Sequence, residues 1–420
     1  MARYRFIEVA SSVYAWDMHD EGVDSVLDNL QDLSHVNSVY LIALMHKERH
    51  PWPNDTFFPH NPIRREYMTE DSVAYWQPDF NRYDGIRPAV PGNFLAGQDW
   101  LELLVDRAKT RGLKVGVELS HTMLGSDRLA AEYPDVRQID IFGKPLATTH
   151  IGENHFVPCM NNPDFRRYVQ QLFCEVSERY PIDYVLNCIM PFPLPAKYLL
   201  TEYEEEMEPW AWITRSPVGS GCFCPSCVKR AKEAGFDLLK ARDGLLKLAE
   251  YEGGTPALKD TNISPMELLL EHREFMDWLE FKCMSVTSFY EELNTALKRV
   301  RPDIDNRMNV YITSHSEYAG FRVSKVAKHF DSMRACVYTE NLGTGLTEKK
   351  RKVLMSLRKT LGKDYHILSA IGVLPGSTPD SVREGIRVSA ECGAQSIALG
   401  HYDGATLDML RAVGEAVETE

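Results

Sequence analysis

Short apolar runs alternate with amphipathic segments along almost the whole chain. Several runs, such as SVYLIALM at 38–45 and SIALG at 396–400, are nearly continuous in apolar residues. Runs of this kind are typical of parallel strands that are covered on both faces. We expect eight strands, at residues 4–10, 38–45, 113–119, 184–189, 309–313, 333–338, 366–371 and 396–399.

Helix start signals lie between these runs. Asn162 and Thr378 each precede a proline that suits the first helical position, and Ser264 with Glu267 forms a capping box. Eight strand–helix alternations fit one closed barrel better than two smaller domains. We therefore predict that residues 1–420 form a single (β/α)8 TIM barrel.

Three connections between the expected strands are much longer than the others. They cover residues 47–95, 120–161 and 190–263 and follow the second, third and fourth strands. In a barrel such loops lie on the C-terminal face, where barrel enzymes carry their active sites. Loops of this length are uncommon unless they serve a function. We expect them to shape the site.

The charge balance limits the classes of partner. Lys and Arg number 47 and Asp and Glu number 60, which gives a net charge of −13 over 420 residues. An acidic chain repels phosphate groups, so we expect no nucleic-acid partner. No apolar run approaches the roughly 20 residues that cross a bilayer, so we expect no membrane span.

The N-terminus and the cysteines indicate the compartment. The opening MARYRFIEVA has no apolar core of a signal peptide, and most of the nine cysteines lie inside apolar patterns. Such thiols are typical of a reducing compartment, so we expect a cytoplasmic protein. A leader that is removed during maturation is compatible with the same sequence.

Polar residues follow most of the expected strands. Because the strand ends of a barrel converge, these side chains are expected to meet in one pocket. The residues concerned are Trp16, Asp17, His46, Glu118, His121, Asn187, His315, Tyr338, Glu340, His401 and Asp403.

Three carboxyl groups of this set are the candidate catalytic residues. Paired carboxylates suit glycoside hydrolysis, in which one group protonates the leaving oxygen and the other attacks or activates water. We rank Glu340 first as nucleophile or base, Glu118 second as proton donor, and Asp403 third. The competing interpretations are a structural ion pair for Glu340, a buried structural acid for Glu118 and a helix N-cap for Asp403.

Aromatic and polar residues of the same loops favour a carbohydrate ligand. Indole rings stack on the C–H faces of sugars, although they also anchor long loops. The expected substrate-binding residues are His121, His315, His401, Asn187, Tyr338, Trp16, Asp17, His46, Trp52 and Trp210. No glycine-rich phosphate loop is present, and we expect no organic cofactor.

The histidines also allow a metal-dependent reaction. His46, His121, His315 and His401 follow four different strands and would form a metal shell with a nearby glutamate. No compact ligand motif supports this alternative, a lyase or isomerase acting on a sugar or sugar acid.

A cysteine cluster is the sharpest local motif. Cys222, Cys224 and Cys227 lie within six residues and suit one side of a tetrahedral zinc site, which needs a fourth ligand. Cys188 and Cys159 are the candidates for that place. Such a site would be structural; the alternative is a set of reduced thiols without metal.

Taken together, these stretches resemble the glycoside-hydrolase-like (β/α)8 barrel proteins, with distant similarity to the family 42 β-galactosidases. The matching stretches are residues 83–88, 99–101, 108–115, 133–135, 158–163, 180–184, 222–227 and 372–402. The resemblance implies a carbohydrate substrate, a structural zinc at the three cysteines and a homo-oligomer.

Two features depart from that family. Its members usually carry an acid at the end of the fourth strand, where this chain has Asn187 and Cys188, and Glu340 follows the sixth strand instead of the seventh. Either another carboxylate such as Glu118 replaces the missing acid, or the chemistry differs. A third alternative is a barrel that binds sugar without catalysis.

Overall fold

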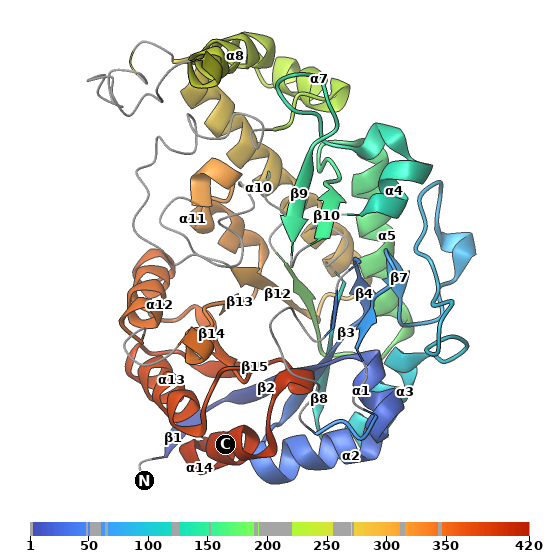
Figure 1. Cartoon of the computed structure of the whole chain (residues 1–420), viewed down its shortest axis with the longest axis vertical. Coiled ribbons are helices and arrows are strands. Elements are labelled where there is room, and N and C mark those ends of the chain that lie inside the picture. Colours follow the sequence, from blue (N-terminus) through green and yellow to red (C-terminus); the bar gives the residue numbers. More distant parts are fainter. Residues whose placement is uncertain are drawn as a thin grey trace.

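Eight parallel strands close into a barrel, which confirms the expected (β/α)8 TIM barrel (Figure 1). The computed structural model describes residues 3–47, 49–50, 60–63, 66–119, 126–150, 153–188, 192, 221–254, 270, 273–310, 316–342 and 347–419. In barrel order the strands are β2 (Glu8–Val13), β3 (Ser38–Ile42), β8 (Lys114–Glu118), β11 (Tyr184–Asn187), β12 (Asp305–Val310), β13 (Ser332–Ala335), β14 (His366–Gly372) and β15 (Ser396–Gly400).

Helices surround this barrel on the outside (Figure 1). The α-helices are α1 (Ala15–Glu21), α2 (Val23–Asp28), α3 (Trp100–Thr110), α4 (Asp127–Glu132), α5 (Pro163–Arg179), α7 (Pro225–Glu233), α8 (Leu238–Gly254), α10 (Glu274–Val300), α11 (Val323–Val326), α12 (Thr347–Leu361), α13 (Pro379–Glu391) and α14 (Leu407–Ala416). None of the described helices has the length and apolar character that a membrane crossing needs.

Two of the expected helix starts are confirmed by their hydrogen bonds. The Asn162 side chain accepts from the backbone N–H groups of Asp164 and Phe165, and the Thr378 side chain accepts from that of Ser381. In both helices proline occupies the first turn, where no backbone donor is needed. The expected capping box at Ser264 lies outside the described residues.

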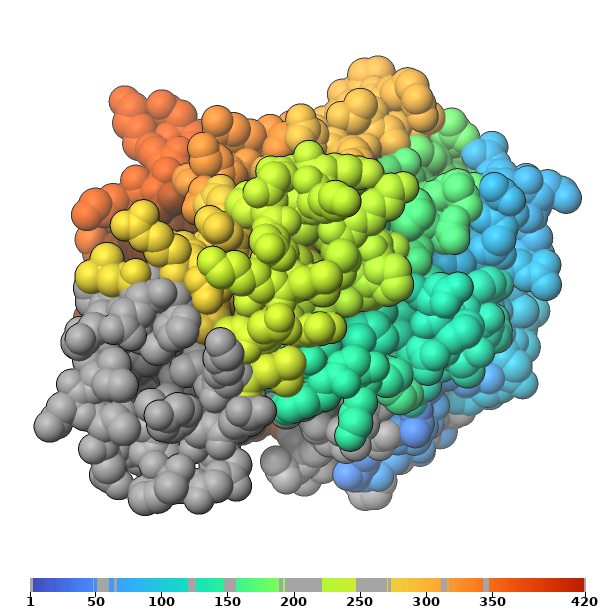
Figure 2. Space-filling model, turned by 90° about the horizontal axis from the view of Figure 1, so that it is seen from above, coloured from blue at the N-terminus to red at the C-terminus, as the bar shows by residue number. Residues whose placement is uncertain are grey.

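The long connections carry small antiparallel strand pairs. In the first, β5 (Arg49–His50) pairs with β6 (Tyr67–Met68), and β7 (Val73–Ala74) pairs with β4 (Leu44–Met45), which precedes the connection. The second contains the hairpin of β9 (Ala147–His150) and β10 (Glu153–Phe156). Seen from above, the yellow-green segment that contains α7 lies between the teal segment that contains α4 and the light orange part of the segment that contains α10 (Figure 2).

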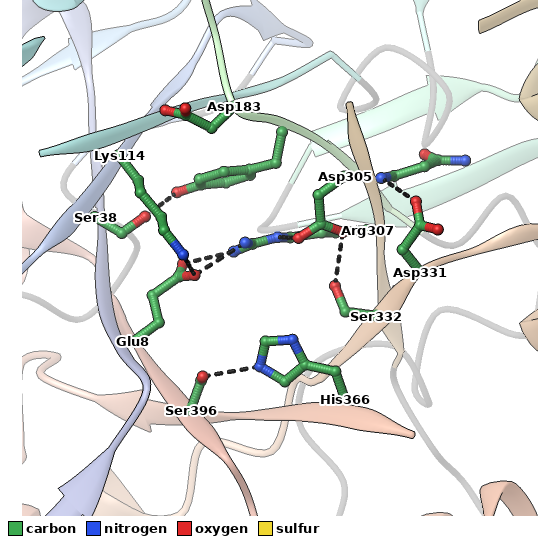
Figure 3. Close-up of polar contacts among 12 residues, drawn as sticks. Glu8, Ser38, Lys114, Asp183, Asp305, Arg307, Asp331, Ser332, His366 and Ser396 are labelled. Atoms are coloured by element: carbon green, nitrogen blue, oxygen red, sulfur yellow. Dashed lines mark hydrogen bonds and ion pairs between the residues drawn. The ribbon is translucent and has the colours of Figure 1, made fainter. Parts of the chain in front are cut away.

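The N-terminal end of the barrel is filled by a polar cluster (Figure 3). Arg307 forms a two-bonded ion pair with Glu8, at 2.6 and 2.9 Å, and both residues are at most 3% exposed. The Arg307 guanidinium lies 3.7 Å from the Tyr184 ring centroid, and the Tyr184 and Ser38 hydroxyls are 2.8 Å apart. Because these groups fill that end, the opposite end is left for a site.

Glycine makes room for this cluster at one strand. A Cβ atom on Gly116 would lie 2.0 Å from the Tyr184 ring, which no side chain tolerates. Gly116 pairs with Tyr184 in the β8–β11 register, so the large ring and the missing side chain are direct neighbours. The polar cluster therefore depends on a glycine in the middle of β8.

The Glu8–Arg307 pair makes stability depend on pH. Burial alone would raise the pKa of Glu8, but the charge and hydrogen bonds of Arg307 outweigh it and lower the pKa below the usual value of 4.5. The ionised Glu8 carboxylate contributes its full stabilisation at pH values above about 4.5, the usual pKa of the group. This contribution is lost as the pH falls through the lower pKa of Glu8 in the folded protein. Acid unfolding should therefore begin below about pH 4.5.

A double variant isolates this contribution. Glu8→Gln with Arg307→Met replaces both members of the pair by uncharged groups, so its stability should fall less steeply between pH 5 and pH 3. Urea denaturation at several pH values measures the difference, and an unchanged slope would contradict the assignment.

Candidate functional site

Glu118 occupies the centre of the C-terminal end of the barrel. It ends β8, is 2% exposed and receives the thiol of Cys188 at Oε1 (2.8 Å) and the amide of Asn309 at Oε2 (3.3 Å). Donors directed at both oxygens favour the ionised carboxyl. Burial, and next the charge of Glu118, raise the pKa of Cys188 well above its usual value, which keeps the thiol a donor.

A second group of polar residues continues from Glu118 across the barrel. Arg334 of β13 donates to the Tyr338 hydroxyl at 2.7 Å, and the Tyr338 ring centroid lies 6.3 Å from that of His401. A Cβ atom on Gly400 would lie 2.7 Å from the Tyr338 hydroxyl, so glycine makes this approach feasible. Burial would lower the pKa of Arg334, but nearby groups, including Tyr338 and Glu118, hold it above its usual range.

His401 connects these residues to the end of β2, the first barrel strand. Its Nδ1 lies 3.1 Å from both the Ser12 and the Tyr14 hydroxyls, and the Tyr14 ring stacks on Trp16 at 4.1 Å. His50 packs against Trp16 and lies 3.4 Å from a carboxyl oxygen of Asp403. The described residues thus form one row of contacts from Arg334 to Asp403, and the charge of Glu118 acts on Arg334 at the start of this row.

Glu340, the first-ranked catalytic candidate, lies elsewhere. Its Oε1 accepts from the Lys350 ammonium, and its Oε2 accepts from the backbone N–H groups of Thr339 (3.0 Å) and Gly372 (2.9 Å). A Cβ atom on Gly385 of α13 would lie 2.0 Å from Oε1, so the carboxyl is pressed against the helix layer. This is the geometry of the structural ion pair, the competing interpretation of the sequence.

Asn187 also lies differently from the expectation. Its amide donates to Asn306 (2.8 Å), whose own amide donates to Asn294 of α10 (3.0 Å), so Asn187 joins the strand to a helix. Side chains alternate along a strand, and the next residue, Cys188, is the one that reaches Glu118. The inward side chain at the end of the fourth strand is therefore a thiol.

The remaining binding candidates are either buried or lie outside the described residues. Trp16 is fully buried under Tyr14 and His50, and His46 is buried after β4, so neither is an exposed platform for a sugar ring. Asp17 is buried in α1, where its Oδ2 accepts from the Tyr14 backbone N–H at 2.9 Å. His121, His315, Trp52 and Trp210 lie outside the described residues.

The cysteine motif acquires its fourth member from Cys159. Among the described residues, the ligand atoms of Cys159, Cys222, Cys224 and Cys227 all lie within 4.8 Å of one another, and all four side chains are buried. Cys188, the other candidate, bonds to Glu118 instead. The four-cysteine cluster is the only group of this kind among those residues, and it contains no histidine.

The cluster has the shape of a zinc site. Sulfur atoms at about 2.3 Å from a tetrahedral zinc lie about 3.8 Å apart, and here Cys159 lies 3.5 Å from both Cys224 and Cys227. The backbone N–H of Ile139 points at the Cys222 sulfur (3.2 Å), and the amide of Asn161 points at that of Cys227 (3.3 Å). Such donors favour thiolates, the form that binds a metal.

The comparisons with known proteins agree with this architecture. No protein-family model matches the sequence, and no curated protein matches it either. Among solved structures, the glycoside hydrolase domain of PgaB (BpsB) from Bordetella bronchiseptica is similar with a TM-score of 0.58 and 12% identity, over 94% of this chain and 93% of that one.

The fold is shared with glycoside hydrolases. The α-L-fucosidase isoenzyme 2 from Paenibacillus thiaminolyticus has a TM-score of 0.54 at 14% identity, over 99% of this chain and 49% of that chain. The β-galactosidase from Bacillus circulans sp. alkalophilus has a TM-score of 0.54 at 16% identity, over 95% of this chain and 50% of that chain. This chain thus spans about half the length of these two proteins. Family 42, to which the β-galactosidase Gan42B belongs, is among these distant neighbours.

The sequence did not mark three residues at the C-terminal end of the barrel, which is called the mouth from here on. Arg334, Tyr14 and Asn309 belong to the row or bond to Glu118, but none was a candidate. A two-residue period along SMRACVY would have marked Arg334, because it shares a strand face with Cys336 and Tyr338. A charged residue within a buried strand is itself a signal, since an isolated buried charge is costly.

The environment of Glu340 predicts a structural effect of its removal. Burial lowers the pKa of Lys350, and Glu340 opposes this shift, so the two groups depend on each other. Glu340→Gln should reduce the free energy of unfolding by about 3–5 kcal/mol, because it leaves a buried ammonium without its partner. Urea denaturation measures the loss.

A second substitution serves as the control. Adding Lys350→Met to Glu340→Gln removes the unpaired charge and should recover much of the stability. A single variant as stable as the wild type would refute the structural role.

Proposed function

We propose that this chain is a glycoside hydrolase that acts on an oligosaccharide or glycoside at the C-terminal end of its barrel. The observation that carries the proposal is the Glu118 carboxyl, which ends a barrel strand and receives hydrogen bonds at both oxygens from Cys188 and Asn309. A fold shared with glycoside hydrolases supports it.

Glu118 acts in this proposal as an ionised carboxylate. The sequence favoured Glu118 as proton donor, but a carboxyl that accepts two hydrogen bonds is better suited to attack the anomeric carbon or to activate water. Asp403 is the second carboxyl at the mouth. We assign Glu340 to the ion pair with Lys350 and give it no part in the reaction.

Groups along the row would bind the sugar hydroxyls. Tyr338 is half-buried and His401 is 7% exposed, so both lie close to the surface of the mouth. Hydroxyl and imidazole groups donate and accept hydrogen bonds, which suits a neutral polyhydroxylated ligand. A carbohydrate is therefore the expected partner, bound by a single barrel with long loops.

The ends of β11 and β14 favour a second candidate function, carbohydrate binding without catalysis. The inward group at the end of β11 is the Cys188 thiol, and β14 ends at Gly372 without a carboxyl. A barrel that lacks acids at these two positions suits carbohydrate binding without catalysis. Calorimetry that shows tight oligosaccharide binding without turnover would favour this alternative over the hydrolase.

The cysteines support two smaller assignments. All nine are free thiols, which fits a cytoplasmic protein. We infer that Cys159, Cys222, Cys224 and Cys227 hold a structural zinc, since four buried sulfurs leave no open position for a substrate. The metal would tie the start of α7 to the segment before α5.

The first test replaces Glu118 by its uncharged analogue. Glu118→Gln keeps the size of the side chain and an oxygen for one of the two described donors, so the protein should stay folded, but kcat should fall roughly 10²–10⁴-fold or more because the charge is lost. A panel of 2,4-dinitrophenyl glycosides measures turnover. Glu415→Gln, on the exposed face of α14, is the matched control. Retained activity in Glu118→Gln would refute the assignment.

The second test measures the metal. Purified protein should contain about one zinc per chain, and Cys159→Ser should lose it and lower the melting temperature, because a tetrahedral site needs all four ligands. Cys392→Ser, at a thiol outside the cluster, should change neither value. Absence of zinc from both the wild type and Cys392→Ser would contradict the inference.

A further inference from the structure

Two aspartates are carried by the segments that follow the first and last barrel strands. β2 and β15 are paired in parallel, with Ser11 opposite Leu399. After these strands the chain continues into α1, which carries Asp17, and into the short turn Tyr402–Gly404, which carries Asp403. The closure of the barrel thus brings together two acids that are far apart in sequence.

Asp17 has an unusual environment for a carboxyl group. It is 1% exposed, its Oδ2 accepts from the Tyr14 backbone N–H at 2.9 Å, and its Oδ1 has no partner in the described part of the chain. A buried carboxylate with one unpaired oxygen is costly, whereas a carboxylic acid is not. The geometry alone therefore favours the neutral, protonated form.

The surrounding charges act in the same direction. Burial, and then the negative charges of Asp403, Glu21 and Asp20, raise the pKa of Asp17 well above its usual range, and only the Tyr14 N–H opposes them. Among the described residues, Asp403 and Glu21 pair with histidines, His50 at 3.4 Å and His60 at 2.9 Å. No described lysine or arginine forms an ion pair with Asp17.

Asp17 is also connected to the row that begins at Arg334. The backbone N–H of Tyr14 donates to Asp17 Oδ2, and the Tyr14 hydroxyl lies 3.1 Å from Nδ1 of His401. His401 in turn faces Tyr338. Glu118, with donors at both oxygens, is poorly suited to supply a proton. The proposed hydrolysis therefore lacks an acid, and the mouth contains a carboxyl that is kept neutral.

We propose that Asp17 is the proton donor of this site. This inference rests on the proposed glycosidase function. As the bond between the anomeric carbon and the leaving oxygen breaks, the Asp17 proton moves to that oxygen. The anomeric carbon finally takes the hydroxyl of a water molecule, and the remaining proton restores the Asp17 carboxyl.

Leaving groups of different basicity test this role. Dinitrophenolate departs without a proton, whereas methoxide requires one. In Asp17→Asn, kcat/KM for the methyl glycoside should fall roughly 10²–10⁴-fold and that for the 2,4-dinitrophenyl glycoside of the same sugar less than about tenfold. Glu415→Gln removes an exposed acid of α14 that takes no part in the surroundings of Asp17, and it should leave both rates unchanged.

The outcomes separate the two proposals. If the wild type hydrolyses no glycoside of the panel, the glycosidase function fails. If the wild type is active and Asp17→Asn loses both substrates equally, only the role of Asp17 is overturned.

An infrared measurement decides the protonation state without any substrate. The C=O stretch of a protonated carboxyl should be present in the wild type at neutral pH and absent in Asp17→Asn. If that variant does not fold, Asp403→Asn replaces it, because removal of the neighbouring charge should lower the pH at which the band titrates. No such band in the wild type overturns the proposal.

Discussion

Parallel pairing between β2 and β15 closes the barrel, and the candidate site depends on this closure. The pairing places His401 beside Ser12 and Tyr14, and it brings the charge of Asp403 to bear on Asp17. The chain ends meet at the opposite, N-terminal end of these strands, where β1 (Tyr4–Phe6) pairs with β16 (Val417–Thr419) (Figure 1). The closing strands are therefore held by contacts at both of their ends.

Two buried ion pairs in the described part of the barrel differ from the buried acids of the mouth, and this difference separates structural from chemical roles. The Glu8–Arg307 and Glu340–Lys350 pairs each satisfy both partners, so they stabilise the barrel or its helix layer and leave no group to react. Glu118 and Asp17 differ, because the donors described at their oxygens are the thiol of Cys188, the amide of Asn309 and a backbone N–H group. Acids in such surroundings are candidates for groups whose protonation state a substrate can change.

The strands and the helix starts could be predicted well from the sequence. Continuous apolar runs require burial on both faces, and proline after a capping residue has few other uses than to begin a helix. All eight barrel strands overlap expected runs, although the first begins later and the fifth earlier than expected, at Glu8 and Asp305. The first run divides into β1, which pairs with β16, and the barrel strand β2, while the fifth strand begins with the polar residues Asp305 to Arg307, which an apolar pattern does not include.

By itself, the sequence determined which strands form the barrel, which loops are long and which three cysteines cluster. The tertiary structure decided which face each strand-end side chain occupies. Adjacent residues point in opposite directions, so Cys188 reaches Glu118 while Asn187 joins a helix, and Glu340 turns outward to Lys350. The fold likewise places the sulfur of Cys159, and not that of Cys188, within 4.8 Å of the other three cysteine sulfurs. Sequence patterns record local periodicity, whereas these choices depend on contacts between residues that only the closed barrel brings together.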